Sequence, residues 1–163
     1  MLLDWGLFCQ VDRLGSEPAP ETLSGTVHLI DGTQRPVRQT QLIPGLLGRG
    51  FGTVVSLPPG RRLPLPVMVE VLHPPMGPNG ITRQAWPSIL GSSGPTVSTW
   101  SFDLPAEVVP GDWRFRMLAG REVLLEIPFR VSLADPAAPP GPCDPEAAIS
   151  STTSIPSTPR GSG

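Results

Sequence analysis

Four side chains that could form a binding site lie close together in the sequence. His73, Met76, Arg83 and Trp86 occupy a stretch with several prolines and glycines and no alternation of apolar and polar residues, which is typical of a loop. Because Trp and Arg dominate the binding energy of protein interfaces, an exposed Trp86 beside Arg83 suits a binding surface. Alternatively, Trp86 folds over the open end of the domain as a lid. The sequence leaves both interpretations open.

A metal site is the second chemistry that this stretch could support. Met68, His73 and Met76, together with Cys9 or Cys143, are soft or imidazole ligands that suit copper or zinc. Cys9, however, shares a stripe with apolar residues, where a buried and inert thiol is the common outcome. We therefore expect no metal and no other cofactor.

Catalytic motifs are missing. His28 and His73 are the only histidines, and no G-x-S-x-G, G-x-x-x-x-G-K-[ST] or H-E-x-x-H pattern occurs. Asp103, Glu107 and Asp112 cluster around one connector and could do acid–base work in a shared cleft. Beside a tight turn, carboxylates more often accept hydrogen bonds from backbone amides. A hydrolase is therefore the third hypothesis, and we predict a non-enzymatic protein.

Composition and charge exclude several partners. The formal net charge of −2 gives no broad basic surface for nucleic acid. No stretch approaches the roughly 18 apolar residues of a membrane-spanning helix, and the N-terminal residues do not form a visible export signal. The two cysteines, one in a predicted strand and one in the tail, do not suggest a disulfide framework, so we predict a cytoplasmic protein without membrane insertion.

Prolines and glycines punctuate the sequence and favour a β-fold. With 23 prolines and 18 glycines, no proline-free stretch shows a sustained apolar stripe at helical spacing. Several segments instead alternate apolar and polar residues with a period of two, which predicts strands with one buried face. About eight such strands predict an all-β, antiparallel sandwich. The expected strands cover 3–11, 23–30, 37–43, 51–57, 67–71, 96–104, 113–117 and 121–131.

The last two predicted strands form a hairpin whose register follows from its apolar pattern. If both apolar sets face one core, Met117 opposes Val123, which requires an odd-length loop around Gly120 unless a bulge intervenes. The same register places Arg114 opposite Glu126 on the outer face.

The chain changes character after the last predicted strand. Residues 134–163 are rich in proline, serine and threonine. They contain few apolar side chains whose burial could offset the conformational entropy that is lost when a segment becomes ordered. We therefore predict a β-sandwich domain over residues 1–133 and a disordered tail over residues 134–163.

The sequence resembles a known type of domain in two respects. The segment Leu104-Pro-Ala-Glu-Val-Val-Pro-Gly-Asp-Trp-Arg-Phe, with the strand that follows Gly120, resembles the closing hairpin of immunoglobulin-like or fibronectin-like bacterial β-sandwiches. Together with Gly6-Leu-Phe-Cys, Gly50-Phe-Gly and His73-Pro-Pro, the span from about residue 4 to 132 is similar to an uncharacterised bacterial family of domains of unknown function. The resemblance implies the sandwich architecture and carries no activity.

These observations favour a protein-interaction module whose loops, around residues 73–86, contact another protein. A β-sandwich that binds a small molecule or carbohydrate, with Trp86 stacked on the ligand, is the alternative.

Overall fold

The computed structural model describes residues 1–10 and 13–144. Within these ranges the chain forms ten strands and one short 3-10 helix. The elements are β1 (Leu2–Phe8), β2 (Arg13–Pro18), β3 (Thr26–Ile30), β4 (Leu42–Gly45), β5 (Gly50–Val55), β6 (Leu65–Met76), β7 (Ile81–Leu90), β8 (Thr96–Ser101), η1 (Pro105–Glu107), β9 (Gly111–Ala119) and β10 (Glu122–Leu133).

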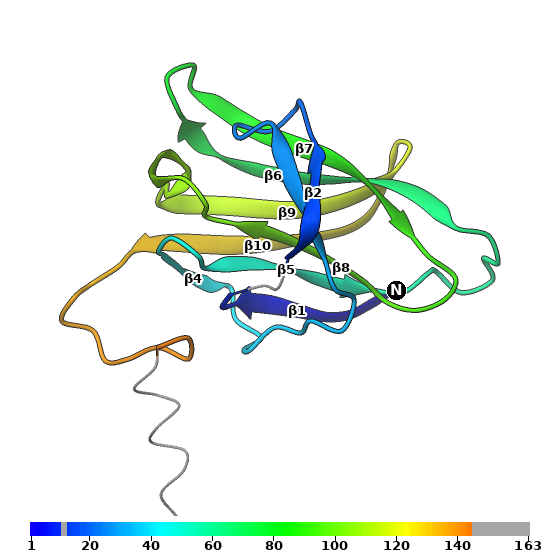
Figure 1. Ribbon diagram of the computed structural model, residues 1–163, viewed down its shortest axis with the longest axis horizontal. Helices are drawn as coiled ribbons and strands as arrows, with labels where there is room; N and C mark the ends of the chain where they lie inside the picture. The colour runs from blue at the N-terminus through cyan, green and yellow to red at the C-terminus, as the bar shows by residue number, and fades with distance from the viewer. Residues whose placement is uncertain (11–12, 145–163) are drawn as a thin grey trace, which may run out of the picture.

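Two sheets pack face to face, and a separate hairpin crosses them. One sheet has the strand order β1-β5-β8 and the other β4-β10-β9-β6-β7, while β2 and β3 pair only with each other (Figure 1). The predicted all-β sandwich is confirmed. Its strands are mostly antiparallel, but β4 runs parallel to β10, since a long connection returns the chain to that edge.

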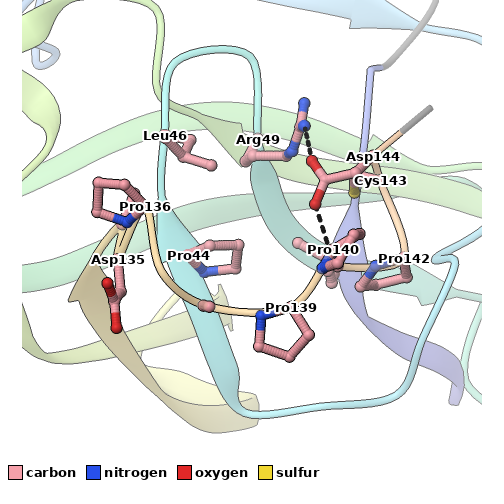
Figure 2. A pocket seen from close by; sticks show the side chains of 14 residues that line it. Pro44, Leu46, Arg49, Asp135, Pro136, Pro139, Pro140, Pro142, Cys143 and Asp144 are labelled. Carbon is pink, nitrogen blue, oxygen red and sulfur yellow. Dashed lines mark hydrogen bonds and ion pairs between the residues drawn. The ribbon is translucent and has the colours of Figure 1, made fainter. Parts of the chain in front are cut away.

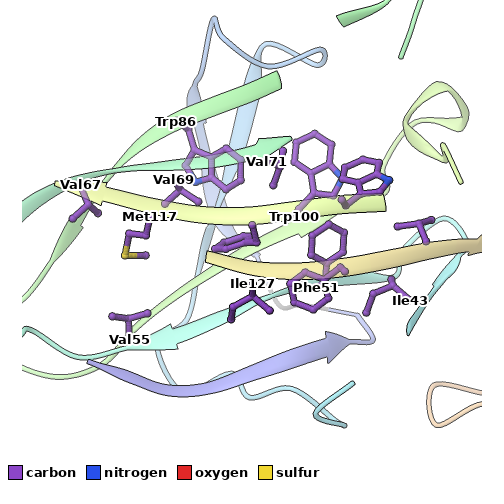
Figure 3. Packing of buried hydrophobic residues seen from close by; sticks show 14 of the residues in the cluster. Ile43, Phe51, Val55, Val67, Val69, Val71, Trp86, Trp100, Met117 and Ile127 are labelled. Carbon is purple, nitrogen blue, oxygen red and sulfur yellow. The ribbon is translucent and has the colours of Figure 1, made fainter. Parts of the chain in front are cut away.

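Aromatic rings fill the space between the sheets (Figure 3). The ring of Phe51 on β5 lies 4.6 Å from that of Phe129 on β10 and 5.7 Å from that of Trp113 on β9. Apolar residues at alternate positions of β6, β9 and β10 face these rings, as period-two strands require. The core therefore rests on the strands whose alternation is clearest in the sequence.

The β9–β10 hairpin has the predicted sidedness except at Val123, and it does not have the predicted register. Its turn contains two residues, 120–121, and a bulge between Val123 and Leu125 shifts the pairing. Met117 consequently opposes Leu125, and the prediction that it opposes Val123 is wrong. The bulge turns Val123 away from the core and leaves it with an exposed fraction of 43%.

The predicted pair on the outer face forms in a modified way. Glu126 stands directly opposite Arg116, and Arg114 stands opposite Pro128. The guanidinium of Arg114 still reaches the Glu126 carboxylate diagonally, with Nη1 3.6 Å from Oε1. The ion pair is thus confirmed, whereas its register is not.

Strand β7 occupies a segment that was predicted to be a loop. Gln84, Ala85 and Trp86 are buried in succession, which conceals a period of two. Gln84 and Trp86 lie opposite inward residues of β6. Ala85 lies on the other face, where it is covered by Glu21, whose backbone carbonyl accepts a hydrogen bond from the Ala85 N–H. Strand β2 was also missed, because its residues are exposed throughout and do not alternate.

The two cysteines form a disulfide, so the prediction of unpaired cysteines is wrong. Cys9 follows β1 and Cys143 lies 134 positions later, yet their Cα atoms are 5.2 Å apart. After β10 ends at Leu133, residues 134–144 return towards β1 in turns, and the disulfide ties them there. The prediction for residues 145–163 lies outside the described residues. The argument for a cytoplasmic location, which relied on unpaired cysteines, no longer holds.

Among the described residues, no helix is both long and apolar enough to span a bilayer.

Candidate functional site

A cavity opens where the edges of the two sheets meet. β7 ends the five-stranded sheet and β8 ends the three-stranded sheet, and the β2–β3 hairpin, here called the flap, lies across the gap between them. The cavity beneath the flap measures about 570 Å³, and a pocket of about 30 Å³ continues it inwards. We call these two spaces the edge cleft.

Two tryptophans form the inner wall of the edge cleft. The rings of Trp86 on β7 and Trp100 on β8 lie 6.1 Å apart at an interplanar angle of 35°. Their exposed fractions are only 6% and 5%. The indole N–H of Trp100 and the hydroxyl of Thr99 are buried without a hydrogen-bond partner among the described residues. A buried donor without a partner is costly, so this wall offers unused hydrogen-bonding capacity.

Charged groups line the inner end of the edge cleft. The carboxylate of Asp103 accepts a hydrogen bond from Arg13 at 2.5 Å and contacts Nε2 of His28 at 2.7 Å. Arg13 and His28 belong to the flap, whereas Asp103 follows β8. One carboxylate therefore fastens both strands of the flap to the edge of the smaller sheet.

Glu107 lies beside this group but performs a local task. Its Oε1 accepts hydrogen bonds from the backbone N–H of Leu104 at 2.7 Å and of Asp103 at 3.0 Å. Burial raises the pKa of Glu107, and these two hydrogen bonds act in the opposite direction. The carboxylate caps the turn formed by η1, which is the structural role expected of an acidic residue at such a turn.

The other end of the flap is fastened to β7 through a buried glutamine. Gln84 accepts a hydrogen bond from the backbone N–H of Leu23 at 2.6 Å. Its amide nitrogen lies 3.1 Å from Nε2 of His73 and 3.3 Å from the sulfur of Met76. The imidazole of His73 packs on Trp113 at 4.7 Å. His73 and Met76 thus support the residue that holds the flap tip.

The ionisation of His73 follows from this environment. Burial lowers the pKa of His73, although the hydrogen bond to the Pro74 carbonyl acts in the opposite direction. The neutral ring donates from Nδ1 to that carbonyl at 2.8 Å and accepts from Gln84 at Nε2, an assignment made from the surrounding hydrogen bonds. His73 therefore acts as a neutral structural group.

Arg83 connects the flap to the outer face of the larger sheet. Its Nε donates to Glu70 at 2.6 Å and its Nη1 donates to Glu21 of the flap tip at 3.2 Å. The hydrogen bond to Glu70 is the main reason why the pKa of Arg83 is raised. Glu70 also accepts from Arg116, so two guanidinium groups compensate its burial.

The four sequence-predicted binding residues therefore share the β6–β7 hairpin but do not form one exposed surface. His73, Met76 and Trp86 are buried, and only Arg83 keeps its head group partly in solvent. The prediction that Trp86 lies in a loop is wrong, and the interpretation that it is exposed does not hold, because strand pairing with β6 turns its ring inwards. Trp86 nevertheless lines the edge cleft.

Of the candidate copper or zinc ligands, His73 and Met76 both contact the amide nitrogen of Gln84, but the two cysteines are not available. Cys9 and Cys143 are bonded to each other, so neither supplies a thiolate. Within the described part of the chain, no three His, Cys, Asp or Glu side chains lie close enough together to hold a metal ion.

The predicted acidic cluster is brought together only in part. Asp103 and Glu107 are neighbours at the edge cleft, whereas Asp112 points to solvent and pairs with Arg130 at 3.1 Å. Sequence reasoning missed Arg13, His28 and Trp100 as lining residues of the edge cleft. Of these three residues, only Arg13 lies on a strand, β2, that the sequence pattern could not have identified, because a polar, exposed strand shows no alternation of apolar and polar residues.

Comparisons with known proteins agree with this architecture. The two packed sheets define an immunoglobulin-like β-sandwich, and the fold is similar to the crystal structure of an immunoglobulin-like protein (PA1606) from Pseudomonas aeruginosa. The TM-score is 0.50 at 20% identity, and the match covers 78% of this chain and 97% of that chain. At this identity the likeness shows the fold alone.

The family follows from the sequence match. Residues 1–131 match the family described as Domain of unknown function (DUF3859), and the chain belongs to it. No curated protein matches the chain.

Proposed function

We propose that the domain is a non-enzymatic protein-interaction module that binds an extended segment of a partner in the edge cleft. The observation that carries this proposal is a pair of sheet edges that have no strand neighbour among the described residues, and the β7 edge donates one N–H, that of Ala85, to Glu21. Among the described strands, β7 and β8 each have a strand neighbour on one side only, and the cavity lies between their other sides. An extended peptide satisfies such an edge by adding a strand, with main-chain hydrogen bonds for affinity and side-chain pockets for specificity.

The side chains around the edge cleft support the same partner. Leu29 and Ile89 are large exposed apolar residues at the rim, and the exposed fraction of Ile89 is 60%. Exposed apolar residues beside a groove are typical of a surface that another chain covers.

A small molecule or carbohydrate is the second candidate ligand, and one observation favours it. The two tryptophan rings lie beside the Asp103 and His28 pair at the inner end of the edge cleft. Aromatic faces together with a few polar groups are common in small-molecule sites.

Peptide selection tests the proposal directly. Peptides from a displayed random library are selected on the wild-type domain, and amide hydrogen exchange of the complex is measured. We expect slower exchange at residues 96–101. Ile89→Glu should weaken binding at least tenfold, because it places a charge on the apolar rim. Leu42→Glu, on the β4 edge at the far side of the same sheet, is the matched control and should bind normally.

Two results would contradict the peptide proposal. One is peptide binding that is insensitive to Ile89→Glu and leaves exchange in β8 unchanged. The other is the absence of peptide binders combined with saturable quenching of tryptophan fluorescence by an oligosaccharide or metabolite, which would favour the second candidate.

A further inference from the structure

A second cavity lies under the segment that follows β10. Residues 134–144, here called the latch, arch over β4 and the loop after it and border a partly open cavity of about 730 Å³ (Figure 2). Pro44 and Leu46 form one wall, and the rings of Pro136, Pro139 and Pro142 belong to the latch on the other side. The volume falls within the range of about 300 to 1,000 Å³ that is usual for small-molecule sites, and the walls are predominantly apolar.

The latch is secured at both ends, so the cavity is a built feature of the domain. β10 continues directly into it, and the disulfide between Cys9 and Cys143 ties its far end to the end of β1. Asp144 adds a local closure, since its Oδ2 accepts a hydrogen bond from the backbone N–H of Gly141 at 2.5 Å.

Three charged side chains line this cavity, those of Arg49, Asp135 and Asp144, and much of the hydrogen-bonding capacity of Arg49 is unused. The side chain of Arg49 is only 20% exposed. Among the described residues its guanidinium makes one ion pair, with Nη2 3.4 Å from Oδ1 of Asp144. A guanidinium carries five N–H donors in a fork that matches a carboxylate in a bidentate pair. A single long contact leaves most of this capacity unused.

We propose that the latch cavity binds an apolar carboxylate. The hydrocarbon body would lie between the Leu46 wall and the proline rings, and the carboxylate would accept hydrogen bonds from the guanidinium donors of Arg49 that Asp144 leaves free. These donors select the class of ligand, because a carboxylate accepts from two of them at once, whereas an alcohol accepts at a single oxygen and an ammonium group has no acceptor to offer. This site is separate from the edge cleft and does not depend on the proposed function.

Isothermal titration calorimetry of the oxidised full chain with three matched amphiphiles tests the proposal. Decanoate should saturate at one molecule per chain, and 1-decanol and decylammonium should bind at least tenfold more weakly. Arg49→Gln should reduce decanoate affinity at least tenfold, to about the affinity for 1-decanol. Arg62→Gln, an exposed arginine that does not line the cavity, is the matched control and should leave decanoate binding unchanged.

The position of the bound probe is checked by methyl NMR on the wild-type chain. Decanoate should shift the methyl signals of Leu7 and Leu46, which line the latch cavity, and leave those of Leu29 at the edge cleft in place. Absent or unsaturable decanoate binding, equal affinity for 1-decanol, or shifts confined to the edge cleft would each overturn the proposal. If Arg49→Gln fails to fold, the comparison of decanoate, 1-decanol and decylammonium on the wild-type chain still tests the proposal.

Discussion

The flap and the latch both cover a cavity, but different forces hold them. Hydrogen bonds and ion pairs fasten the flap at both ends, through Gln84 to β7 and through Asp103 to the end of β8. The latch is fastened by a covalent bond and one ion pair. Polar contacts break and re-form in thermal fluctuations, whereas a disulfide responds to a thiol reductant. The comparison teaches that the flap is held by contacts that open in thermal fluctuations, whereas the latch is held by a bond that opens only on reduction.

Breaking the disulfide has the largest expected effect on stability. Because it joins residues 134 positions apart, it constrains nearly the whole unfolded chain. By the chain-entropy relation, Cys143→Ser should lower the free energy of unfolding by about 3 to 5 kcal/mol in urea titrations without reductant. With dithiothreitol, the wild type should fall to the level of the variant. Equal stability of the two proteins under oxidising conditions would show that the latch is not held covalently.

Loosening the flap should cost less and act more locally. Gln84→Ala removes the acceptor for the Leu23 N–H and the donor to His73, both in a buried setting. We expect a loss of about 2 to 4 kcal/mol, together with faster amide exchange at Leu23. Gln39→Ala, an exposed glutamine that bonds Asp4, is the control and should stay within about 0.5 kcal/mol. Unchanged exchange at Leu23 would contradict the role assigned to Gln84.

Mild acid should weaken the support that His73 gives to the flap. Because the pKa of His73 is lowered from 6.5 in the folded chain, the unfolded chain binds a proton at higher pH than the folded one. The stability from the neutral ring is therefore complete above about pH 6.5 and is lost as the pH falls through that value. His73→Phe keeps a ring against Trp113 but cannot titrate.

Urea titrations at about pH 7.5 and pH 5.5 measure this difference. We expect a smaller decline in His73→Phe than in the wild type, whatever the absolute stability of the variant, since the other groups titrate alike in both proteins. Parallel declines would remove His73 as the source of the pH dependence.

The smallest effect on stability is expected at the rim of the edge cleft. Ile89→Glu replaces an exposed side chain and should change the free energy of unfolding by no more than about 0.5 kcal/mol. Thermal unfolding checks this expectation, and it also validates the variant for the binding experiment. A large destabilisation would mean that Ile89 belongs to the packing of the flap.

Part of the candidate site was predictable from the residues. The stretch around His73 and Trp86 was identified as important, and Trp86 does line the edge cleft. Its burial was not predictable, because a hydrogen-bonded Gln84 at an inward position interrupts the apolar alternation that identifies a strand. The flap was missed for a related reason: β2 is exposed along its whole length and carries no periodic signal.

The period-two alternation of apolar and polar residues determined the β-sandwich, because side chains alternate between the two faces of every strand and their polarity shows which face is buried. The same alternation identified the inward residues of β9 and β10. Only the tertiary structure decided the parallel pairing of β4 with β10, the bulge after Val123 and the bond between Cys9 and Cys143. The parallel pairing and the disulfide depend on where segments distant in the sequence meet, and the bulge depends on the geometry of one turn. A two-residue period contains no information about any of these.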